Sequence, residues 1–264
     1  MKSRRYAGQT VLVTGASSGI GLEMAKLFAR DGYRLVLVSR NRAALDRLAK
    51  GLRQEHQADV FVAEADLSIP AAVKELIQTL EDQNINIDVL VNNAGSGRSG
   101  LFQDIPWQED EQVIQLNMAS LTQLTKAVLP HMREKRAGGI LNVASTGAYQ
   151  PGPFTAVYYA SKAYVLSFTQ ALRHELKPDG IQVSAFCPGA TRTAFSERAG
   201  KRDQPGAMSA EQAARIGYSG FHKGKAVIVP GLTNKMAVAM SCALPGPLLA
   251  RLVAKLQERV IIRK

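Results

Sequence analysis

Cysteine and histidine are both scarce in this sequence of 264 residues. Two cysteines, Cys187 and Cys242, are too few for a disulfide framework, which favours a reducing, cytoplasmic location. The four histidines are scattered without the spacing of metal ligands, so no metal site is expected. The chain also has no long apolar run after Met1, and the apolar residues 11–13 are too few for a signal peptide.

Acidic residues are outnumbered: 22 aspartates and glutamates stand against 33 lysines and arginines, which gives a formal net charge of +11. This balance is typical of a basic, solvated surface, or of a protein with anionic partners such as a phosphorylated cofactor, an acidic membrane or nucleic acid. The sequence has no nucleic-acid-binding motif, so we expect no nucleic-acid partner. With 46% hydrophobic and 21% charged residues, the chain suits one globular α/β domain with a sizeable core.

A glycine-rich stretch follows a short β-type run, residues 9–14, and leads into a helical pattern with Met24, Leu27 and Phe28 on one face. In a strand–turn–helix unit, glycines allow a tight turn and a close approach of the backbone to a pyrophosphate, and the helix N-terminus offers unpaired N–H groups to it. A purely structural turn is the alternative. The stretch reads Thr14, Gly15, Ala16, Ser17, Ser18, Gly19, Ile20 and Gly21.

The second β-type run, residues 34–38, ends in Ser39, Arg40, Asn41 and Arg42. In dinucleotide-binding proteins the adenosine ribose lies at the end of this strand, and an acidic residue there accepts a hydrogen bond from the 2′-hydroxyl of NAD. Here the position offers no acid. Because an arginine can pair with a 2′-phosphate instead, Arg40 favours NADP(H). The alternative is an exposed arginine at the start of a helix.

Tyr158 and Lys162 lie four residues apart in a run, residues 154–176, whose apolar side chains recur at helical spacing. Positions four apart share one face of a helix, so the phenol and the ammonium can point at the same spot. A cation beside a phenol lowers its pKa from about 10, which favours proton transfer near neutral pH. The same spacing is common in surface pairs, so it does not decide the role alone.

The order of motifs over residues 9–193 resembles that of the short-chain dehydrogenase/reductase family. Ser145 precedes Tyr158 by thirteen residues, as the family's serine precedes its tyrosine. The resemblance implies an α/β fold with a doubly wound, Rossmann-type, mostly parallel sheet in a single domain. The motifs are Thr14-Gly-x-x-x-Gly-Ile-Gly21, Asp66, Asn92-Asn-Ala-Gly95, Ser145, Tyr158-x-x-x-Lys162 and Pro188-Gly189.

The resemblance also implies a role for each motif residue. Tyr158 would donate a proton, Ser145 would hydrogen-bond the substrate oxygen, and Lys162 would keep the tyrosine pKa low and hold the nicotinamide ribose. Asn117 looks like the asparagine that holds a water joining the lysine to solvent, although its local sequence also fits a solvent-facing side chain. The cofactor contacts implied are Thr14, Gly15, Ser17, Ser18, Gly19, Ile20, Gly21, Ser39, Arg40, Asp66, Leu67, Asn93, Ala94, Gly95, Tyr158, Lys162, Pro188, Gly189, Thr191 and Thr193.

The polar, glycine-containing residues 193–208 predict a mobile substrate lid, since they follow the stretch that would border the nicotinamide. Within this border Cys187 is better explained as a small buried hydrophobe than as a reactive thiol.

The tail departs from the family. Many members end in Asp-Gly-Gly, which helps to build a tetramer, whereas this chain continues Pro230-Gly231-Leu232. We therefore expect a homodimer, and we divide the chain into a catalytic Rossmann domain, residues 1–231, and a helical extension, 232–264, that is not an independent domain. The extension begins with fifteen uncharged residues, 236–250, and ends in an amphipathic pattern. This helix would dock on the protein or contact a membrane surface or a partner through its basic stripe of Arg251, Lys255, Arg259 and Arg263.

The resemblance thus implies an NADPH-dependent oxidoreductase that transfers hydride between nicotinamide and a carbonyl or secondary alcohol. The expected substrate is a small, apolar molecule that the sequence does not identify. A non-catalytic NADP-binding sensor or scaffold is the alternative, and the full set of Asn117, Ser145, Tyr158 and Lys162 argues against it.

Overall fold

A parallel sheet forms the centre of the computed structural model, which describes residues 8–200, 202 and 206–261. Seven strands pair in the order β3-β2-β1-β4-β5-β6-β9, and every pair is parallel. The expected doubly wound, Rossmann-type fold is therefore confirmed. The strands are β1 (Thr10–Thr14), β2 (Arg34–Ser39), β3 (Val60–Glu64), β4 (Val89–Asn92), β5 (Gly138–Val143), β6 (Ile181–Phe186) and β9 (Val227–Ile228), and a separate two-stranded sheet pairs β7 (Thr191–Arg192) with β8 (Met208–Ser209).

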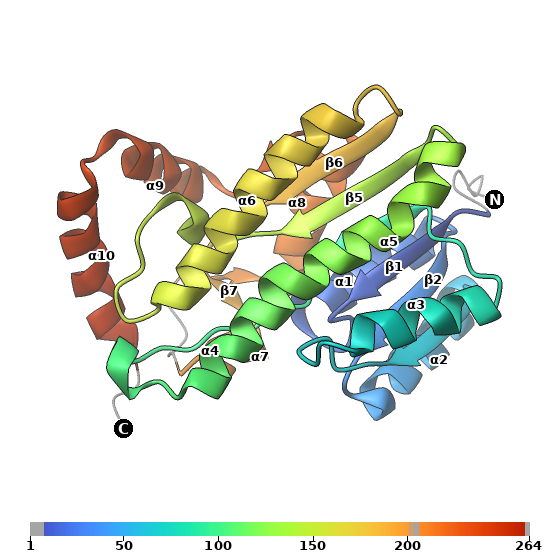
Figure 1. Ribbon diagram of the computed structural model, residues 1–264, viewed down its shortest axis with the longest axis horizontal. Helices are drawn as coiled ribbons and strands as arrows, with labels where there is room; N and C mark the ends of the chain where they lie inside the picture. The colour runs from blue at the N-terminus through green and yellow to red at the C-terminus, as the bar shows by residue number, and fades with distance from the viewer. Residues whose placement is uncertain (1–7, 201, 203–205, 262–264) are drawn as a thin grey trace.

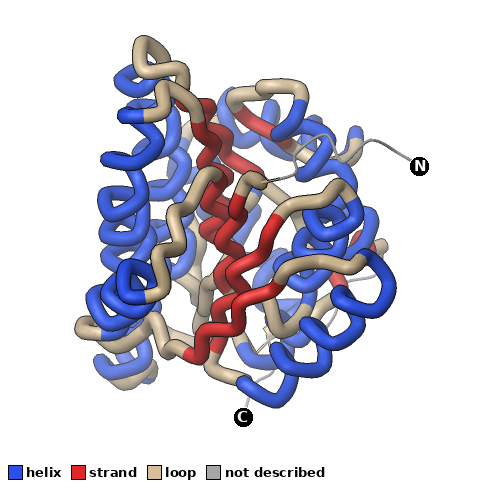
Figure 2. Tube along the Cα trace, turned by 90° about the vertical axis from the view of Figure 1, so that its right-hand side faces the viewer, coloured by secondary structure: helices blue, strands red, loops and turns tan. Residues whose placement is uncertain are grey.

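Helices cover both faces of the sheet (Figures 1 and 2). One apolar core joins the sheet to α1 (Gly19–Arg30), α2 (Arg42–His56) and α8 (Ala210–His222). A second core, on the opposite face, joins it to α3 (Ala72–Asp82), α5 (Leu121–Glu134) and α6 (Ala156–Leu176). The remaining elements are α4 (Trp107–Ile114), α7 (Ala194–Arg198), α9 (Leu232–Ala243), α10 (Gly246–Val260) and the short segments η1 (Phe102–Asp104), η2 (Gln115–Ser120) and η3 (Thr146–Tyr149).

The central strands are continuous apolar runs because they are buried on both faces. All five residues of β1 are buried, and so are Leu35 to Val38 in β2. β1 pairs with β2 on one side and with β4 on the other, so the strand order reverses next to β1. In open parallel sheets this reversal leaves a crevice at the carboxyl ends of the strands, where ligands bind.

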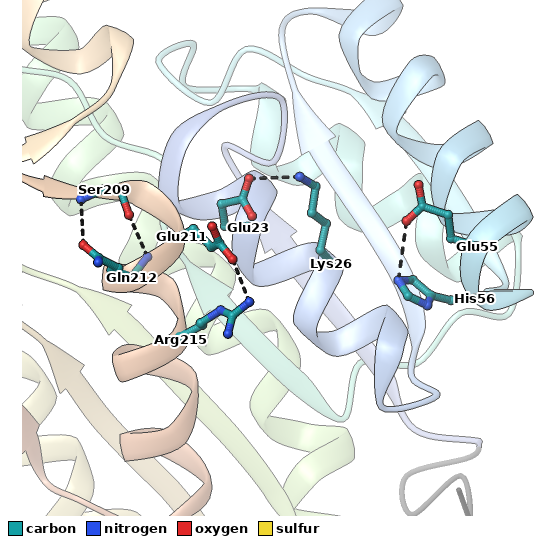
Figure 3. A network of polar contacts seen from close by, with 8 residues as sticks. All are labelled: Glu23, Lys26, Glu55, His56, Ser209, Glu211, Gln212 and Arg215. Carbon is teal, nitrogen blue, oxygen red and sulfur yellow. Dashed lines mark hydrogen bonds and ion pairs between the residues drawn. The ribbon is translucent and has the colours of Figure 1, made fainter. Parts of the chain in front are cut away.

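Helix α8 begins at a capping box, in which Ser209 accepts a hydrogen bond from Gln212 N at 3.1 Å and the Gln212 side chain accepts one from Ser209 N at 3.4 Å (Figure 3). The helix packs against α1 through Tyr218, whose ring meets Phe28 edge to face and whose hydroxyl donates to Asp31 at 2.6 Å. These contacts fix α1, and with it the glycine turn that precedes it. The ion pairs drawn nearby, such as Glu23 with Lys26, are solvent-exposed and contribute little.

The tail forms two helices, α9 and α10, at the end of the molecule opposite α2 and α3 (Figure 1). Pro247 lies in the first turn of α10, where a proline costs no helical hydrogen bond. Helix α10 buries Leu249, Val253 and Gln257, while its Leu248, Leu252 and Leu256 are exposed. The predicted stripe continues to Arg263, which lies outside the described residues. Within the described ranges no helix is long and apolar enough to cross a membrane.

Two glycines offer a test of the packing between the sheet and α8. A Cβ at Gly139, in β5, would lie 2.5 Å from Cζ of the Phe221 ring, whereas a Cβ at Gly51, in α2, would have nothing within 4 Å. We expect Gly139→Ala to lower the free energy of unfolding by about 1–3 kcal/mol, as overpacking does. The matched variant Gly51→Ala should raise it by up to about 1 kcal/mol, because alanine favours a helix. Urea unfolding measures both, and equal stability of the two variants would contradict the packing described.

Candidate active site

The glycine turn is joined to the loop after β4 by one threonine side chain. The Thr14 hydroxyl accepts hydrogen bonds from the backbone N–H groups of Asn93 and Ala94, both at 2.9 Å, and donates to Val91 O at 3.3 Å. The Asn93 side chain donates back to Thr14 O at 2.8 Å. The two loops at the crevice are thus held together, and glycine is required at position 21, where a Cβ would lie 2.4 Å from Asn93 Nδ2.

The N-terminus of α1 keeps its first N–H groups available. Ser18 is the N-cap residue, and its side chain makes no capping hydrogen bond. Gly19 follows with φ +57°, a left-handed conformation that glycine adopts without strain. Ser17, Ser18 and Ile20 are half-buried around this turn. A free helix N-terminus behind a glycine turn is a suitable cradle for a pyrophosphate.

Arg40 is an exposed cation at the end of β2. Its side chain is 64% exposed, and among the described residues it makes one ion pair, a long one of 3.6 Å to Asp66. Burial opposes ionisation of Asp66, but hydrogen bonds from Ser68 and the charge of Arg40 hold the pKa of its carboxyl below the usual value. Arg42, two residues on, instead contacts both oxygens of Asp46 at 3.1 Å. Of the two arginines, Arg40 is therefore the one available to an anionic ligand.

The catalytic candidates meet where β5 and α6 approach each other. Ser145 follows β5, and its Oγ accepts a hydrogen bond from Gly147 N at 3.0 Å, so the hydroxyl can act as a donor to another group. The Tyr158 side chain is hydrogen-bonded to Ser145. Lys162 is 5% exposed, and its ammonium donates to Val143 O at 2.8 Å and lies 5.8 Å from the centre of the Tyr158 ring. The three residues expected from the sequence are thus neighbours.

Burial dominates the acid–base state of this group. It raises the pKa of the Tyr158 phenol, and the hydrogen bond to Ser145 only partly opposes the increase. It lowers the pKa of the Lys162 ammonium to about 8. The sequence predicted that Lys162 would lower the pKa of Tyr158. The structure differs, because the ammonium lies over the ring and is bonded to a carbonyl. Tyr158 is therefore a protonated phenol near neutral pH.

Asn117 lies in η2, a π-helical segment between α4 and α5. It is 1% exposed, which excludes the solvent-facing alternative. Its side-chain oxygen accepts a hydrogen bond from Ser96 N, and its side-chain NH2 group donates to Ser96 O and to Ser161 Oγ, both at 2.9 Å. Since a Cβ at Gly95 would lie 3.3 Å from Asn117 Oδ1 and 3.4 Å from Lys162 Nζ, the asparagine is next to the lysine.

The stretch after β6 lies over the glycine turn. A Cβ at Gly19 would be 3.0 Å from the Thr193 methyl group, and the Thr193 hydroxyl caps α7 by accepting from Phe195 N at 3.3 Å. The Phe195 ring is 5.5 Å from the Tyr158 ring. Thr191 Oγ1 donates to Gly189 O at 3.1 Å. Thr193, expected to border a nicotinamide, thus lies against the turn, and Phe195, two residues further on, lies beside the tyrosine.

Two further residues singled out from the sequence, Leu67 and Cys187, are buried in the structure. Leu67 is buried at 4% exposure, and its carbonyl accepts a hydrogen bond from Ser120 at 2.6 Å. Cys187 is fully buried among apolar side chains, and burial raises the pKa of its thiol to about 11, so it is the inert hydrophobe expected. Within the described residues no cluster of metal-ligating side chains occurs.

Sequence reasoning missed the contacts that the tail makes with this site. Asn234 of α9 lies against Gly189, where a Cβ would be 2.2 Å from its Oδ1. Gln257 of α10 donates to the Tyr159 hydroxyl at 2.6 Å, and Ser241 of α9 donates to Gln150 at 3.0 Å. The available signal was a few polar residues among the apolar ones of the tail, Asn234, Ser241 and Gln257.

Comparison with known proteins agrees with this geometry. Residues 9–204 match the sequence profile of the family described as short chain dehydrogenase. The chain belongs to the short-chain dehydrogenase family. It is therefore an oxidoreductase acting on CH–OH and C=O groups, as its motifs indicated.

Three solved structures of this family are similar to the chain. A short-chain dehydrogenase from Sphingobium yanoikuyae in complex with NADPH is 37% identical, with a TM-score of 0.82 over 89% of this chain and 93% of that one. A bulky-bulky ketone specific alcohol dehydrogenase from Comamonas testosteroni is 34% identical, with a TM-score of 0.77 over 88% and 92%. A 3-ketoacyl-(acyl-carrier-protein) reductase from Brucella melitensis complexed with NADH is 30% identical, with a TM-score of 0.74 over 85% and 97%.

The Thr14 hydroxyl provides a test of how the crevice is held. We expect Thr14→Val, which keeps the shape, to lower the free energy of unfolding by about 2–4 kcal/mol, since two buried N–H groups lose their acceptor. Thr14→Ser keeps the hydroxyl and should lose only about 1 kcal/mol with the methyl group. Chemical denaturation compares the two. If the valine variant is no less stable than the serine variant, the hydroxyl does not join the loops.

Proposed function

We propose that this chain is an NADPH-dependent carbonyl reductase that also runs in reverse as an alcohol dehydrogenase. The observation that carries the proposal is the convergence of Ser145, Tyr158 and Lys162 at the carboxyl ends of the strands, next to the glycine turn. Ligands of open parallel sheets bind at this edge. Membership in the short-chain dehydrogenase family supports the same chemistry.

Each side chain has one task in the reaction. When bound, a nicotinamide cofactor supplies hydride to the carbonyl carbon or accepts it from the alcohol. Ser145 donates a hydrogen bond from its hydroxyl to the substrate oxygen and stabilises the negative charge that develops there. Tyr158, protonated in its buried setting, gives its proton to that oxygen. Lys162 then faces a phenolate, and its ammonium stabilises the anion. Asn117 fixes the backbone beside the lysine through Ser96 and Ser161.

The preference for NADP(H) is the second part of the proposal. The glycine turn and the free N-terminus of α1 suit the pyrophosphate, and Arg40 offers an exposed guanidinium where the ribose 2′-phosphate would lie. The similar structures contain NADPH in one case and NADH in another, so the family alone does not decide. Arg40, at the end of a strand that carries no acid there, is what favours the phosphorylated cofactor.

We also propose an apolar substrate. The Phe195 ring lies beside Tyr158, and the tail adds Leu244 to the cluster around Tyr158 and Tyr159. The similarity to an alcohol dehydrogenase described as specific for bulky-bulky ketones supports this choice. A non-catalytic NADP-binding sensor is the competing function. NADPH oxidation measured over a panel of ketones separates the two, since a sensor would bind the cofactor and reduce nothing.

Tyr158 gives the most direct test of the mechanism. Tyr158→Phe keeps the ring and removes the proton, so we expect kcat to fall about 10²–10⁴-fold while the Kd for NADPH stays within a few-fold. Tyr164→Phe is the matched control, because Tyr164 is on the same helix and its hydroxyl contacts Thr122 at 2.8 Å, away from Ser145. A Tyr158→Phe variant that keeps more than about a tenth of the wild-type kcat would overturn the assignment.

Arg40 gives the test of cofactor choice. Arg40→Asp removes the cation and offers an acceptor to a ribose hydroxyl, so we expect NADPH to bind about 10–100-fold more weakly and the preference to move towards NADH. Arg42→Asp, where the arginine is already paired with Asp46, should change the ratio little. Titration of each variant with both cofactors measures this. Equal affinity of the wild type for NADH and NADPH would contradict the role of Arg40.

The assembly and the tail complete the proposal. We propose that the chain forms a homodimer and that residues 232–264 are an appendage of the one domain, since α10 packs on Tyr159. Contact with an anionic membrane stays a prediction. It is supported by the exposed Leu248, Leu252 and Leu256 beside a basic stripe. Co-sedimentation with vesicles that contain phosphatidylserine should then exceed that with neutral vesicles and fall with added salt; equal sedimentation would exclude the contact.

A further inference from the structure

We propose that the tail helices α9 and α10 position Ser145 for catalysis, α10 by contacting Tyr159 and α9 by contacting Gln150. The inference rests on the proposed function, because it assigns a role to residues that support the proposed serine. Tyr159 is 8% exposed and immediately follows Tyr158 on α6, so its side chain leaves the helix on a different face from that of its neighbour. On that face it meets the serine loop, residues 145–152, and both tail helices.

The Tyr159 hydroxyl is held from two directions. Gln257 of α10 donates to it at 2.6 Å, across 98 residues of sequence. Gln150 of the serine loop is hydrogen-bonded to the same hydroxyl, and its carbonyl oxygen accepts from Ser241 of α9 at 3.0 Å. The phenol oxygen therefore links the loop to α10, and Gln150 links the same loop to α9.

The Tyr159 ring packs directly against the backbone of the serine loop. A Cβ at Gly152 would lie 2.2 Å from the Tyr159 Cγ, and a Cβ at Gly147 would lie 3.1 Å from its Cε1. Only glycines allow the loop to lie this close to the ring. Gly147 is also the residue whose N–H donates to Ser145 Oγ at 3.0 Å. The position of the ring thus fixes the backbone group that orients the serine hydroxyl.

The buried side chains of α10 pack against Tyr159. The side chains that the helix buries are Leu249, Val253 and Gln257, four residues apart along one face. The two aliphatic residues form a cluster with Tyr159, and the glutamine bonds its hydroxyl. Removing this support would let the ring and the loop move, and a shift of about 1 Å at a reacting group can cost about 10²-fold in rate.

Gln257→Leu tests the role, with Glu258→Leu as the matched control on the exposed face of the same helix. We expect Gln257→Leu to lower kcat about tenfold and to leave the Kd for NADPH within about twofold, whereas Glu258→Leu changes neither. Tyr159→Phe removes the shared hydroxyl and should give the same loss, which covers the case in which the leucine variant folds poorly. Unchanged kcat in both Gln257→Leu and Tyr159→Phe would overturn the proposal.

A double mutant separates positioning from a general loss of structure. If Gln257 acts through the serine hydroxyl, Gln257→Leu should cost about tenfold in the wild-type background and less than about twofold in a Ser145→Ala background, because the positioned group is gone. An equal loss in both backgrounds would show a merely structural role and overturn the proposal.

Hydrogen–deuterium exchange gives a readout that does not need turnover. The Gly147 amide should exchange faster in Gln257→Leu than in the wild type and in Glu258→Leu, since the loop that holds it loses its support. If no carbonyl is reduced by any form of the protein, the proposed function fails while this measurement still decides the positioning. Unchanged exchange at residues 145–152 would overturn the inference whatever the activity.

Discussion

A buried ammonium without a carboxylate partner is the constraint around which the site is arranged. Lys162 is 5% exposed, and in the described part of the chain its ammonium is bonded to a carbonyl, that of Val143, and makes no ion pair. Removing a charge from water is costly, which is why its pKa falls to about 8. Gly95 lies close to it, since a Cβ there would be 3.4 Å from Lys162 Nζ and 3.3 Å from Asn117 Oδ1. A charge kept in this state gains most when an anion forms next to it, and in the proposed mechanism that anion is the phenolate of Tyr158.

The buried position of the site acts on the hydroxyl of the tyrosine, and a backbone hydrogen bond acts on that of the serine. Burial keeps the Tyr158 phenol protonated, while Ser145 already has its oxygen occupied by Gly147 N. The hydroxyl of the serine can therefore act as a donor, which is the role proposed for it toward a substrate oxygen. A strained backbone is not required for this. The hydroxyl is oriented by one backbone hydrogen bond, and that bond depends on where the serine loop rests.

Local motifs explain why much of this could be predicted from sequence. The glycine turn, Asn93 and the Tyr158–Lys162 pair are each specified within a few residues, and parallel strands bring their ends to one edge. Two features could not be found in this way. The pKa of Tyr158 depends on burial, which no spacing encodes. The contact between Gln257 and Tyr159 spans 98 residues, and a glutamine on a helix has no pattern that points to its partner.

This long separation has a consequence during synthesis of the chain. Ser145, Tyr158 and Lys162 leave the ribosome together, in one segment that can pair with the strands made before it. Gln257 and the apolar side of α10 follow about a hundred residues later. A nascent chain that already carries each of the family's motifs therefore still lacks the contact between α10 and Tyr159 that supports the serine loop. Under the positioning proposed for Gln257, the serine loop gains its full support only after the last helix has docked. A cut between α9 and α10 would return the protein to that earlier state.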